Sequence, residues 1–323
     1  MANMRFAWLR GATISLLRIQ KSFGEMDSYD LLRVYARCGT FKDSARFLEI
    51  SRDSFSQKWY ESGLPSPKAK RTNLSEDPNL PYYEVAVISD MHWGSVYQQK
   101  TFFDQFIEDC KERNIQTLIC CGDVIDGIMA QPFHEEKRFL HTTSEFERYV
   151  YDNYPIGFKN SYLINGNHEK SLSKFEWHYN FCKEIAIRRT DLTYVDPGTS
   201  IVGPGNIIFS VSHGGGSCAA PGQVRNKRLR NKTLQLMSEG NVGHIFLSGH
   251  CHSVAYIPSY MNTIIIGLGC FQAPNEHILR SFGKADVCGL VLGYQVNEYG
   301  QPVNLNVDFR FIDDYGGIIE NDY

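Results

Sequence analysis

Five short apolar runs in this chain each end on residues that bind metal ions, and this repeated arrangement constrains the fold more than any other feature. The runs and the residues behind them are Glu84–Ser89 with Asp90 and His92, Thr117–Cys121 with Asp123 and Asp126, Tyr162–Ile164 with Asn167 and His168, Ile207–Ser212 with His213, and Ile245–Ser248 with His250 and His252. Short apolar runs bounded by turn residues are typical of buried strands. Because α/β sheets bind ligands at the carboxyl ends of their strands, the pattern predicts an α/β fold with a metal site at one sheet edge.

The residues behind these strands have the chemistry of a site for two divalent ions. Imidazole and carboxylate ligands together suit Mn²⁺, Fe²⁺ or Zn²⁺, and we expect Mn²⁺. Asp123 follows the middle run, where one carboxylate can bridge two ions. Two ions about 3.5–4 Å apart can activate a water and stabilise both oxygens of an in-line displacement at phosphorus. The pattern therefore predicts a dinuclear enzyme that hydrolyses phosphoesters.

The departing oxygen also needs a proton donor. His168 can supply that proton, and the Asp126 carboxylate is placed to orient the imidazole. Each short motif is weak evidence by itself, because aspartate and histidine also occupy ordinary turns and buried polar pairs. Their joint occurrence in a fixed order behind apolar strands favours the catalytic interpretation.

The ordered motifs resemble those of the calcineurin-like metallophosphoesterases over residues 82–280. The matching segments are Asp90-x-His92, Gly122-Asp123-x-x-Asp126, Gly166-Asn167-His168-Glu169, His213, and Gly249-His250-x-His252. The resemblance implies a four-layer α/β/β/α sandwich of two mixed sheets. It also implies one metal held by Asp90, His92, Asp123 and His252, a second held by Asp123, Asn167, His213 and His250, and His168 as the proton donor.

Two positions separate this chain from the protein serine/threonine phosphatases of that family. Those enzymes carry an arginine directly after the second aspartate of the Gly-Asp motif and another directly before Gly-Asn-His. Gly127 and Asn165 occupy these positions here, which argues against a phosphoprotein phosphatase. The spacing is closer to the DNA-repair nuclease branch, represented by the double-strand-break exonucleases. No coiled-coil or ATPase segment accompanies the motifs, so a partner of that kind would be a separate subunit.

The N-terminal part of the chain has a different character. Residues 1–25 are basic, and we expect a poorly ordered tail; Arg10 interrupts the apolar stretch, so a secretory signal is not expected. A transit peptide, or an extension upstream of a natural start at Met26, stays open. Residues 26–64 predict a small all-α domain, with helices at Phe41–Leu48 and Arg52–Glu61 after an earlier helix.

These helices are typical of a helix-turn-helix, whose last helix enters the major groove of DNA. In that arrangement Phe55 and Trp59 pack inward. The residues expected to face DNA are Arg52, Ser54, Gln57 and Lys58. A small helical bundle used for docking or dimerisation is the alternative. Residues 65–81, with four prolines, predict a linker to a metallophosphoesterase domain at residues 82–323.

Charge adds to the nucleic-acid hypothesis. Residues 1–72 contain 13 Lys and Arg against 7 Asp and Glu, whereas the remainder contains 20 against 29. The segment Val224–Lys232 follows the His213 turn, and its Arg225, Lys227 and Arg228 are expected along a phosphate backbone. In both places a solvated surface without a partner is the alternative. Trp93, next to His92, either stacks on a base or packs in the core.

Cysteine usage and hydropathy bound the cellular setting. Nine cysteines lack regular spacing and predict reduced thiols in a cytoplasmic protein. No apolar run reaches the roughly 18–20 residues that span a bilayer, so no membrane association is expected. The leading hypothesis is a metal-dependent phosphodiesterase acting on DNA. The alternatives are a phosphomonoesterase or small-nucleotide phosphodiesterase with docking helices, and a DNA-binding regulator with an inactive metal site, against which the full ligand set argues.

Overall fold

The computed structural model describes residues 22–28, 30, 31, 34, 41–62, 79–128, 137–172, 179–214, 222–240, 243–275, 278, 279 and 285–315, without the side chains of residues 43 and 222–226. The chain divides into two compact units, residues 1–75 and residues 76–323. The division falls inside the segment predicted to be a linker. No helix among the described residues is long and apolar enough to cross a membrane.

The N-terminal unit contains a short 3-10 helix, η1 (Phe23–Glu25), and two α-helices, α3 (Phe41–Phe47) and α4 (Arg52–Glu61). Both α-helices lie where the sequence predicts them. Ser51 caps α4 by accepting a hydrogen bond from the Ser54 backbone N–H. Phe55 and Trp59 are fully buried, as predicted from their helical spacing. The helix-turn-helix interpretation itself stays a prediction, because most of the expected first helix and residues 1–21 lie outside the described residues.

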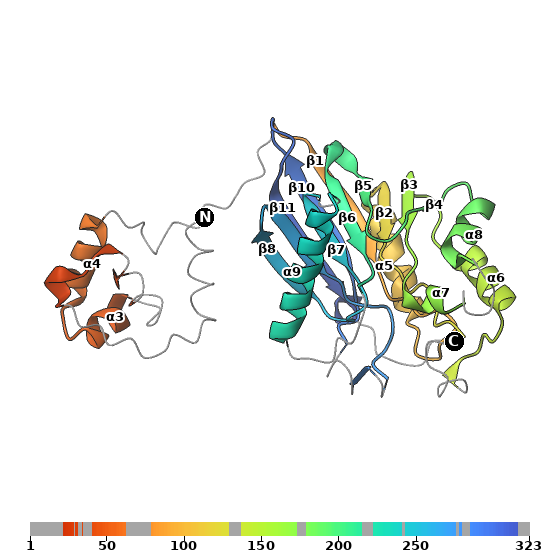
Figure 1. Ribbon diagram of the computed structural model, residues 1–323, viewed down its shortest axis with the longest axis horizontal. Coiled ribbons are helices and arrows are strands. Elements are labelled where there is room, and N and C mark those ends of the chain that lie inside the picture. The colour runs from red at the N-terminus through yellow and green to blue at the C-terminus, as the bar shows by residue number, and fades with distance from the viewer. Residues whose placement is uncertain are drawn as a thin grey trace. The chain divides into compact units, whose positions relative to one another are not determined.

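The larger unit contains two mixed β-sheets (Figure 1). The first has the strand order β11-β10-β1-β2-β3-β4 and the second β5-β6-β7-β9-β8. Strands β1 to β4 are parallel; β10 pairs antiparallel with β1, and β11 pairs antiparallel with β10. In the second sheet β6, β7 and β9 are parallel, with antiparallel strands at both edges. The first-sheet strands are β1 (Tyr82–Ile88), β2 (Thr117–Cys120), β3 (Asn160–Leu163), β4 (Thr193–Tyr194), β10 (Cys288–Val296) and β11 (Pro302–Phe311). The second-sheet strands are β5 (Ser200–Val202), β6 (Ile208–Ser212), β7 (Ile245–Ser248), β8 (Ala255–Tyr260) and β9 (Thr263–Gly267).

The apolar residues of the strands divide between two faces and so build the layers. Val85 and Val87 of β1 join the core between the two sheets, together with Phe209 and Leu247 of the second sheet. Their neighbours in β1 point to the opposite face, because side chains alternate along a strand. That outer face packs against α5 (Lys100–Glu112), α6 (Thr143–Asn153) and α8 (Phe181–Arg188). The outer face of the second sheet packs against α9 (Gly222–Ser238) through Leu236. The result is the predicted α/β/β/α sandwich, with η3 (Pro204–Asn206) and η4 (Ile312–Tyr315) as short additions.

One predicted helix differs in the structure. The sequence predicts a single helix over Ser173–Arg189, but Tyr179 and Asn180 are not helical and α8 begins at Phe181. Asn180 caps α8 with its side chain, which accepts a hydrogen bond from the Lys183 backbone N–H. A capping residue has non-helical backbone angles, so the helix cannot continue through it. A separate helix, α7 (Asn167–Leu172), carries the Gly-Asn-His-Glu motif.

Candidate metal centre

The two sheets bring all five predicted turns to one edge. Strands β1, β2 and β3 are parallel neighbours, and so are β6 and β7, so their carboxyl ends point the same way within each sheet. Backbone hydrogen bonds then join the turns beyond the strands. The N–H of Asp90 donates to the carbonyl of Gly122 at 2.9 Å, and the N–H of His92 donates to the carbonyl of Asp123 at 3.1 Å. Position in the fold therefore holds together side chains that lie up to 160 residues apart in the sequence.

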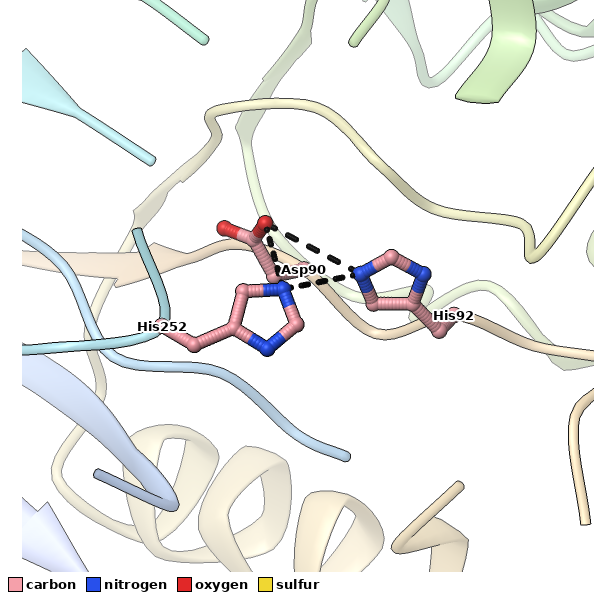
Figure 2. Close-up of side chains that lie close together, drawn as sticks. All are labelled: Asp90, His92 and His252. Atoms are coloured by element: carbon pink, nitrogen blue, oxygen red, sulfur yellow. Dashed lines mark hydrogen bonds and ion pairs between the residues drawn. The ribbon is translucent and has the colours of Figure 1, made fainter. Parts of the chain in front are cut away.

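The first cluster of ligand atoms comes from Asp90, His92 and His252 (Figure 2). His252 Nε2 lies 3.2 Å from Asp90 Oδ1 and 3.0 Å from His92 Nε2. His92 Nε2 lies 3.9 Å from Asp90 Oδ1. The three side chains are almost fully buried. They point toward a common centre from the turns after β1 and β7, and all three belong to the ligand set predicted for the first metal.

A second cluster of ligand atoms comes from Asp123, His213 and His250. His213 Nε2 lies 2.9 Å from Asp123 Oδ2. The two clusters adjoin, because His213 Nε2 is 3.8 Å from Asp90 Oδ1 and His92 Nε2 is 3.9 Å from Asp123 Oδ2. The carboxylates of Asp90 and Asp123 thus lie among imidazoles that come from both sheets.

His168 lies at the side of these clusters, in a third group with His92 and Asp126. Its Nδ1 donates to the backbone carbonyl of Asp126, and its Nε2 lies 3.8 Å from Asp123 Oδ2. The Asp126 carboxylate lies in the same group, 3.5 Å from His92 Nδ1 and 3.8 Å from Arg138 Nε. The sequence expects this carboxylate to orient His168. In the structure the contact between the two residues is made by the Asp126 main chain instead.

The imidazole of His213 shows the bonding pattern of a metal ligand. Its Nδ1 donates to the Cys121 carbonyl at 2.7 Å, which fixes the ring and leaves Nε2 toward Asp123. Among the described residues, Nε2 is buried and forms an ion pair with Asp123 that lacks hydrogen-bond geometry. Metal-binding histidines typically donate their other N–H to a carbonyl or carboxylate in this way. The donor set of imidazoles and carboxylates therefore fits divalent cations.

The backbone at the centre is strained. Five of the eleven described non-glycine residues with positive φ belong to the two clusters: Asp90 at 55°, His92 at 48°, Asp123 at 51°, His250 at 79° and His252 at 46°. Left-handed backbone is unfavourable for residues with a Cβ and occurs mostly where function requires it. The turns therefore hold these side chains in place at a cost in stability.

Two motif glycines allow the carboxylates to approach the neighbouring backbone. A Cβ on Gly166 would lie 2.0 Å from Asp123 Oδ1, and a Cβ on Gly249 would lie 2.7 Å from Asp90 Oδ2. Neither distance is compatible with a side chain. The glycines of Gly-Asn-His-Glu and Gly-His-x-His are thus required by the close packing of the turns around the carboxylates.

Charge at the centre is arranged to keep the carboxylates ionised. Burial raises the pKa of Asp90, but His213 and His252 outweigh burial and lower that pKa to about 2. The pKa of Asp123 lies well below its ordinary value, because His213 and His168 likewise outweigh its burial. Burial lowers the pKa of His213, whereas Asp123 and Asp90 raise it, with a net value of about 9. Without metal, the protein thus holds protons on imidazoles beside two carboxylates.

We expect metal affinity to increase with pH. A metal binds neutral imidazole, so at any pH below the pKa of His213, about 9, binding must displace a proton. The apparent affinity should rise by up to about tenfold per pH unit for each proton released, and level off above that pKa. Calorimetric titration in buffers of different ionisation enthalpy measures the released protons directly. An affinity that stays constant between pH 6.5 and 9 would contradict the protonated state of this histidine.

Glu169 organises the centre, although the sequence gives it no role beyond its place in the Gly-Asn-His-Glu motif. Its buried carboxylate accepts hydrogen bonds from the backbone N–H groups of Asp123 at 3.1 Å, Ile125 at 3.0 Å and Gly166 at 2.6 Å. Burial and the nearby Asp123 raise the pKa of Glu169 to about 7. Asp286 has a similar role at the His252 turn, where its carboxylate accepts from the Val254 N–H at 2.8 Å. No local sequence pattern marks Asp286.

Replacing Glu169 by Gln should weaken metal binding. The amide keeps one acceptor oxygen but turns an NH₂ group toward backbone N–H donors, so at least one bond to the Asp123 turn is lost. We expect about 10–100-fold weaker metal affinity and about 1–3 kcal/mol less stability. Glu108→Gln, at an exposed position on α5, is the matched control. Thermal unfolding and metal titration of both variants test this. An unchanged metal affinity in Glu169→Gln would contradict the positioning role.

The other residues that the sequence predicts at the site are the ligand Asn167, three basic residues of α9 and Trp93. Asn167 begins α7 beside His168, with its side chain exposed. Arg225, Lys227 and Arg228 lie in α9; Lys227 is exposed, Arg228 is half-buried, and the side chain of Arg225 is outside the described residues. Trp93 is buried against Phe103, Tyr149 and Tyr154, so it packs in the core and does not stack on a base.

The residues predicted on the DNA-facing side of α4 divide into two groups. The first group is Arg52, Ser54 and Gln57, which are all exposed. Lys58 is the second, and its ammonium donates to the carbonyl of Gly24 at 2.5 Å and lies 5.3 Å from the centre of the Phe23 ring. Lys58 therefore contacts its own helical unit in this structure, whereas the sequence suggests that it faces DNA.

The cysteines also differ in one place from the expectation. Cys110, Cys120, Cys121, Cys182, Cys270 and Cys288 are free and buried, as the sequence predicts. Cys251, between His250 and His252, is disulfide-bonded, so the expectation that all the cysteines are reduced is wrong at this position.

A protein-family match agrees with this geometry. The family model described as calcineurin-like phosphoesterase matches residues 83–297. A comparison with the curated proteins finds no match. Vps29 from Cryptosporidium parvum is 14% identical with a TM-score of 0.37, covering 71% of this chain and 98% of that one. Vps29 from Entamoeba histolytica complexed with Zn²⁺ is 13% identical with a TM-score of 0.34, covering 71% and 98%. A predicted phosphoesterase from Streptococcus pneumoniae is 11% identical with a TM-score of 0.33, covering 72% and 99%.

Family membership rests on the sequence match, which spans well over half of the chain, and not on these slight structural similarities. The matched region contains every residue of the two ligand clusters. The chain belongs to the calcineurin-like phosphoesterases, metal-dependent hydrolases of phosphoester bonds.

Proposed function

We propose that this protein is a dinuclear, Mn²⁺-dependent phosphodiesterase that cleaves DNA. The observation that carries the dinuclear part is the pair of adjoining clusters, Asp90/His92/His252 and Asp123/His213/His250, with the two carboxylates between them. Fe²⁺ or Zn²⁺ suits the same ligands. When bound, two divalent ions would polarise the phosphoryl oxygens and activate a water for in-line attack.

His168 is the proposed acid for the leaving oxygen. Because a carbonyl can only accept, Nδ1 carries the proton that it donates to Asp126, and Nε2 is the nitrogen that can gain and release a second proton. Nε2 lies 3.8 Å from Asp123 Oδ2, at the side of the clusters. Asp126 fixes the ring from behind, and Arg138 fixes the loop of Asp126 by donating to the carbonyl of Gly127 at 2.8 Å.

The two positions that carry arginine in the phosphoprotein phosphatases have other uses here. Gly127 has φ of +68°, and a Cβ there would lie 2.9 Å from the His168 carbonyl oxygen. Asn165 is buried and binds the α8 cap, donating to Asn180 Oδ1 at 2.8 Å and accepting from the Cys182 N–H at 3.1 Å. Since neither position has room for a phosphate-binding arginine, these contacts support a substrate other than a phosphoprotein.

The preference for DNA rests on the basic N-terminal unit, in which Arg52 and Gln57 lie on the exposed side of α4. We also propose that the protein is cytoplasmic and that it binds a separate partner subunit. The runner-up is a phosphomonoesterase or small-nucleotide phosphodiesterase with docking helices. One observation favours the runner-up: Ser54 and Gln57 already hydrogen-bond within the unit, to Ser51 at 2.8 Å and Glu61 at 2.8 Å.

Replacing Arg52 and Gln57 together by Ala should weaken DNA binding. We expect the salt dependence of binding to become shallower by about one unit of slope for the lost arginine, because each phosphate contact releases counterions. Hydrolysis of a small diester should not change, since no metal ligand is touched. Lys58→Ala, which removes a charge from the inward-facing position, is the contrast. Equal DNA affinity and salt slope in the double variant and the wild type would favour the docking alternative.

The function itself is tested by incubating the purified protein and Mn²⁺ with labelled single- and double-stranded DNA and sizing the products. The proposal expects shortened DNA that carries terminal phosphates, and none in the presence of chelator. Hydrolysis of a nitrophenyl phosphate monoester, with DNA left intact, would instead support the runner-up.

A further inference from the structure

A cavity adjoins the metal centre on the side of α9. It has a volume of about 90 Å³ and lies between α9 and the turns after β6 and β7. Gly214, Arg228, Lys232, His250 and Ser253 are among the residues that line it. His250 also belongs to the second ligand cluster, so the cavity and that cluster share a wall. A space of this size holds several water molecules, and is therefore large enough for one phosphate group.

The charge of the cavity is positive. Arg228 and Lys232 are four residues apart on α9 and so project from the same face of the helix. No aspartate or glutamate is among the described residues that line the cavity. The positively charged side chains of Arg228 and Lys232 thus lie beside the second ligand cluster, and no carboxylate among the described residues of the cavity wall compensates their charge.

The Arg228 guanidinium has an unused donor. Its Nη1 is buried and has no hydrogen-bond partner among the described residues. A buried charged donor without an acceptor is unfavourable, and an anion that supplies the acceptor is favoured correspondingly. Lys232 keeps donor capacity as well, since its ammonium donates to Gln235 Oε1 at 3.1 Å and has two further hydrogens. Arginine binds phosphate through its planar fork, and lysine as a point charge.

We propose that Arg228 and Lys232 bind a second phosphate of the substrate, adjacent to the phosphate that is hydrolysed at the metal centre. This inference rests on the proposed phosphodiesterase function and specifies its substrate class: a nucleotide chain with a phosphate one nucleotide away from the scissile bond. It assigns to α9 the phosphate-binding role that Gly127 and Asn165 cannot have. A diester with a single phosphate leaves the cavity without its anion and binds more weakly.

Two chromogenic substrates test the proposal. One is the 4-nitrophenyl ester of thymidine 5′-phosphate, and the other is the same ester with an additional 3′-phosphate. They share the scissile bond and the leaving group and differ only in the second phosphate. For the wild type with Mn²⁺, we expect a KM about 10–100-fold lower for the substrate with the 3′-phosphate, at similar kcat. This factor is the gain in affinity typical of hydrogen bonds to a charged group.

Arg228→Ala should remove most of this difference, so that the KM of the variant for the substrate with the 3′-phosphate approaches its own KM for the single-phosphate ester. Lys232→Ala should remove part of it, and Arg228→Lys should restore part, because a lysine keeps the charge without the fork. Arg230→Gln is the matched control. It removes one charge from the same helix at a residue stacked on Tyr260, outside the cavity lining. If Arg228→Ala does not fold, Lys232→Ala, at a half-buried residue of the cavity wall, provides the test instead.

The outcomes separate the two proposals. If the wild type hydrolyses neither ester, the proposed function fails. If it hydrolyses both with equal KM, or if Arg230→Gln removes the preference as much as Arg228→Ala does, the phosphate subsite is wrong and the phosphodiesterase stands. The affinity for thymidine 3′,5′-bisphosphate, measured at equilibrium in the presence of chelator, tests the subsite without metal. We expect Arg228→Ala to weaken that binding, and equal affinity would contradict the subsite.

Discussion

Replacing Asp123 by Asn should abolish hydrolysis and lower the metal content of the protein. Asp123 Oδ2 lies 2.9 Å from His213 Nε2 and 3.9 Å from His92 Nε2, so this carboxylate adjoins both ligand clusters. A neutral amide bridges two cations poorly and supplies no charge to hold them. We expect the rate to fall by about 10³-fold or more, since metal ions contribute several kcal/mol of transition-state stabilisation. Metal analysis of the purified variant, together with hydrolysis of a nitrophenyl diester, measures both effects.

The control for this variant is Asp104→Asn, the same chemical change at an exposed position of α5 that pairs with Lys100. It should retain full activity and metal. Circular dichroism should show that both variants fold, because Asp123 also accepts a hydrogen bond from the His168 N–H at 2.9 Å. A folded Asp123→Asn protein with two bound metals and full activity would rule out the bridging role.

Replacing His168 by Ala should slow turnover while metal binding persists. A positioned acid or base typically contributes about 10²–10⁴-fold to the rate. His168 lies beside the clusters, with Nε2 3.8 Å from Asp123 Oδ2, and is assigned no metal. The loss should be large for DNA or an alkyl ester and much smaller for a nitrophenyl ester, because nitrophenolate leaves without a proton.

The leaving-group comparison distinguishes an acid from a residue that only shapes the site. His141→Ala, at an exposed position before α6, is the control and should match the wild type on both substrates. If His168→Ala lost the same factor on good and poor leaving groups, His168 would have a positioning role, and the proton would have to come from elsewhere.

Much of the fold follows from the sequence because the five strands that precede the ligand turns each have an apolar run of their own. Val85 and Val87 alternate with residues of the opposite face, and the turn after each apolar run holds a glycine or a ligand residue at its end. Parallel neighbours then require the turns to meet at one edge. The same reasoning fails where a local cap decides. Asn180 lies within the segment that the sequence predicts as one helix. Its side chain caps the N-terminus of α8, so the helix begins only at the next residue.

The grouping of the proposed ligand residues could be predicted, because imidazoles and carboxylates that follow successive apolar strands in a fixed order are typical of a metal site. Their supporting contacts could not be predicted in this way. Glu169 holds three backbone N–H groups from two turns, and Asp286 holds the His252 turn from a distance of about thirty residues in sequence. Such contacts depend on how loops fold over one another, which no periodicity encodes. For the same reason the sequence could not show that Lys58 turns toward Gly24 or that the Asp126 main chain, and not its carboxylate, contacts His168.

The central claim is that two divalent ions bound at adjoining clusters are needed for hydrolysis. It is tested most directly by titrating metal-free protein with Mn²⁺ while following bound Mn²⁺ by electron paramagnetic resonance and hydrolysis of a nitrophenyl diester in the same samples. We predict two ions per chain, a spectrum of two coupled ions, and activity that appears only as the second ion binds. Full activity at one ion per chain, or activity that persists in chelator, would contradict the dinuclear account.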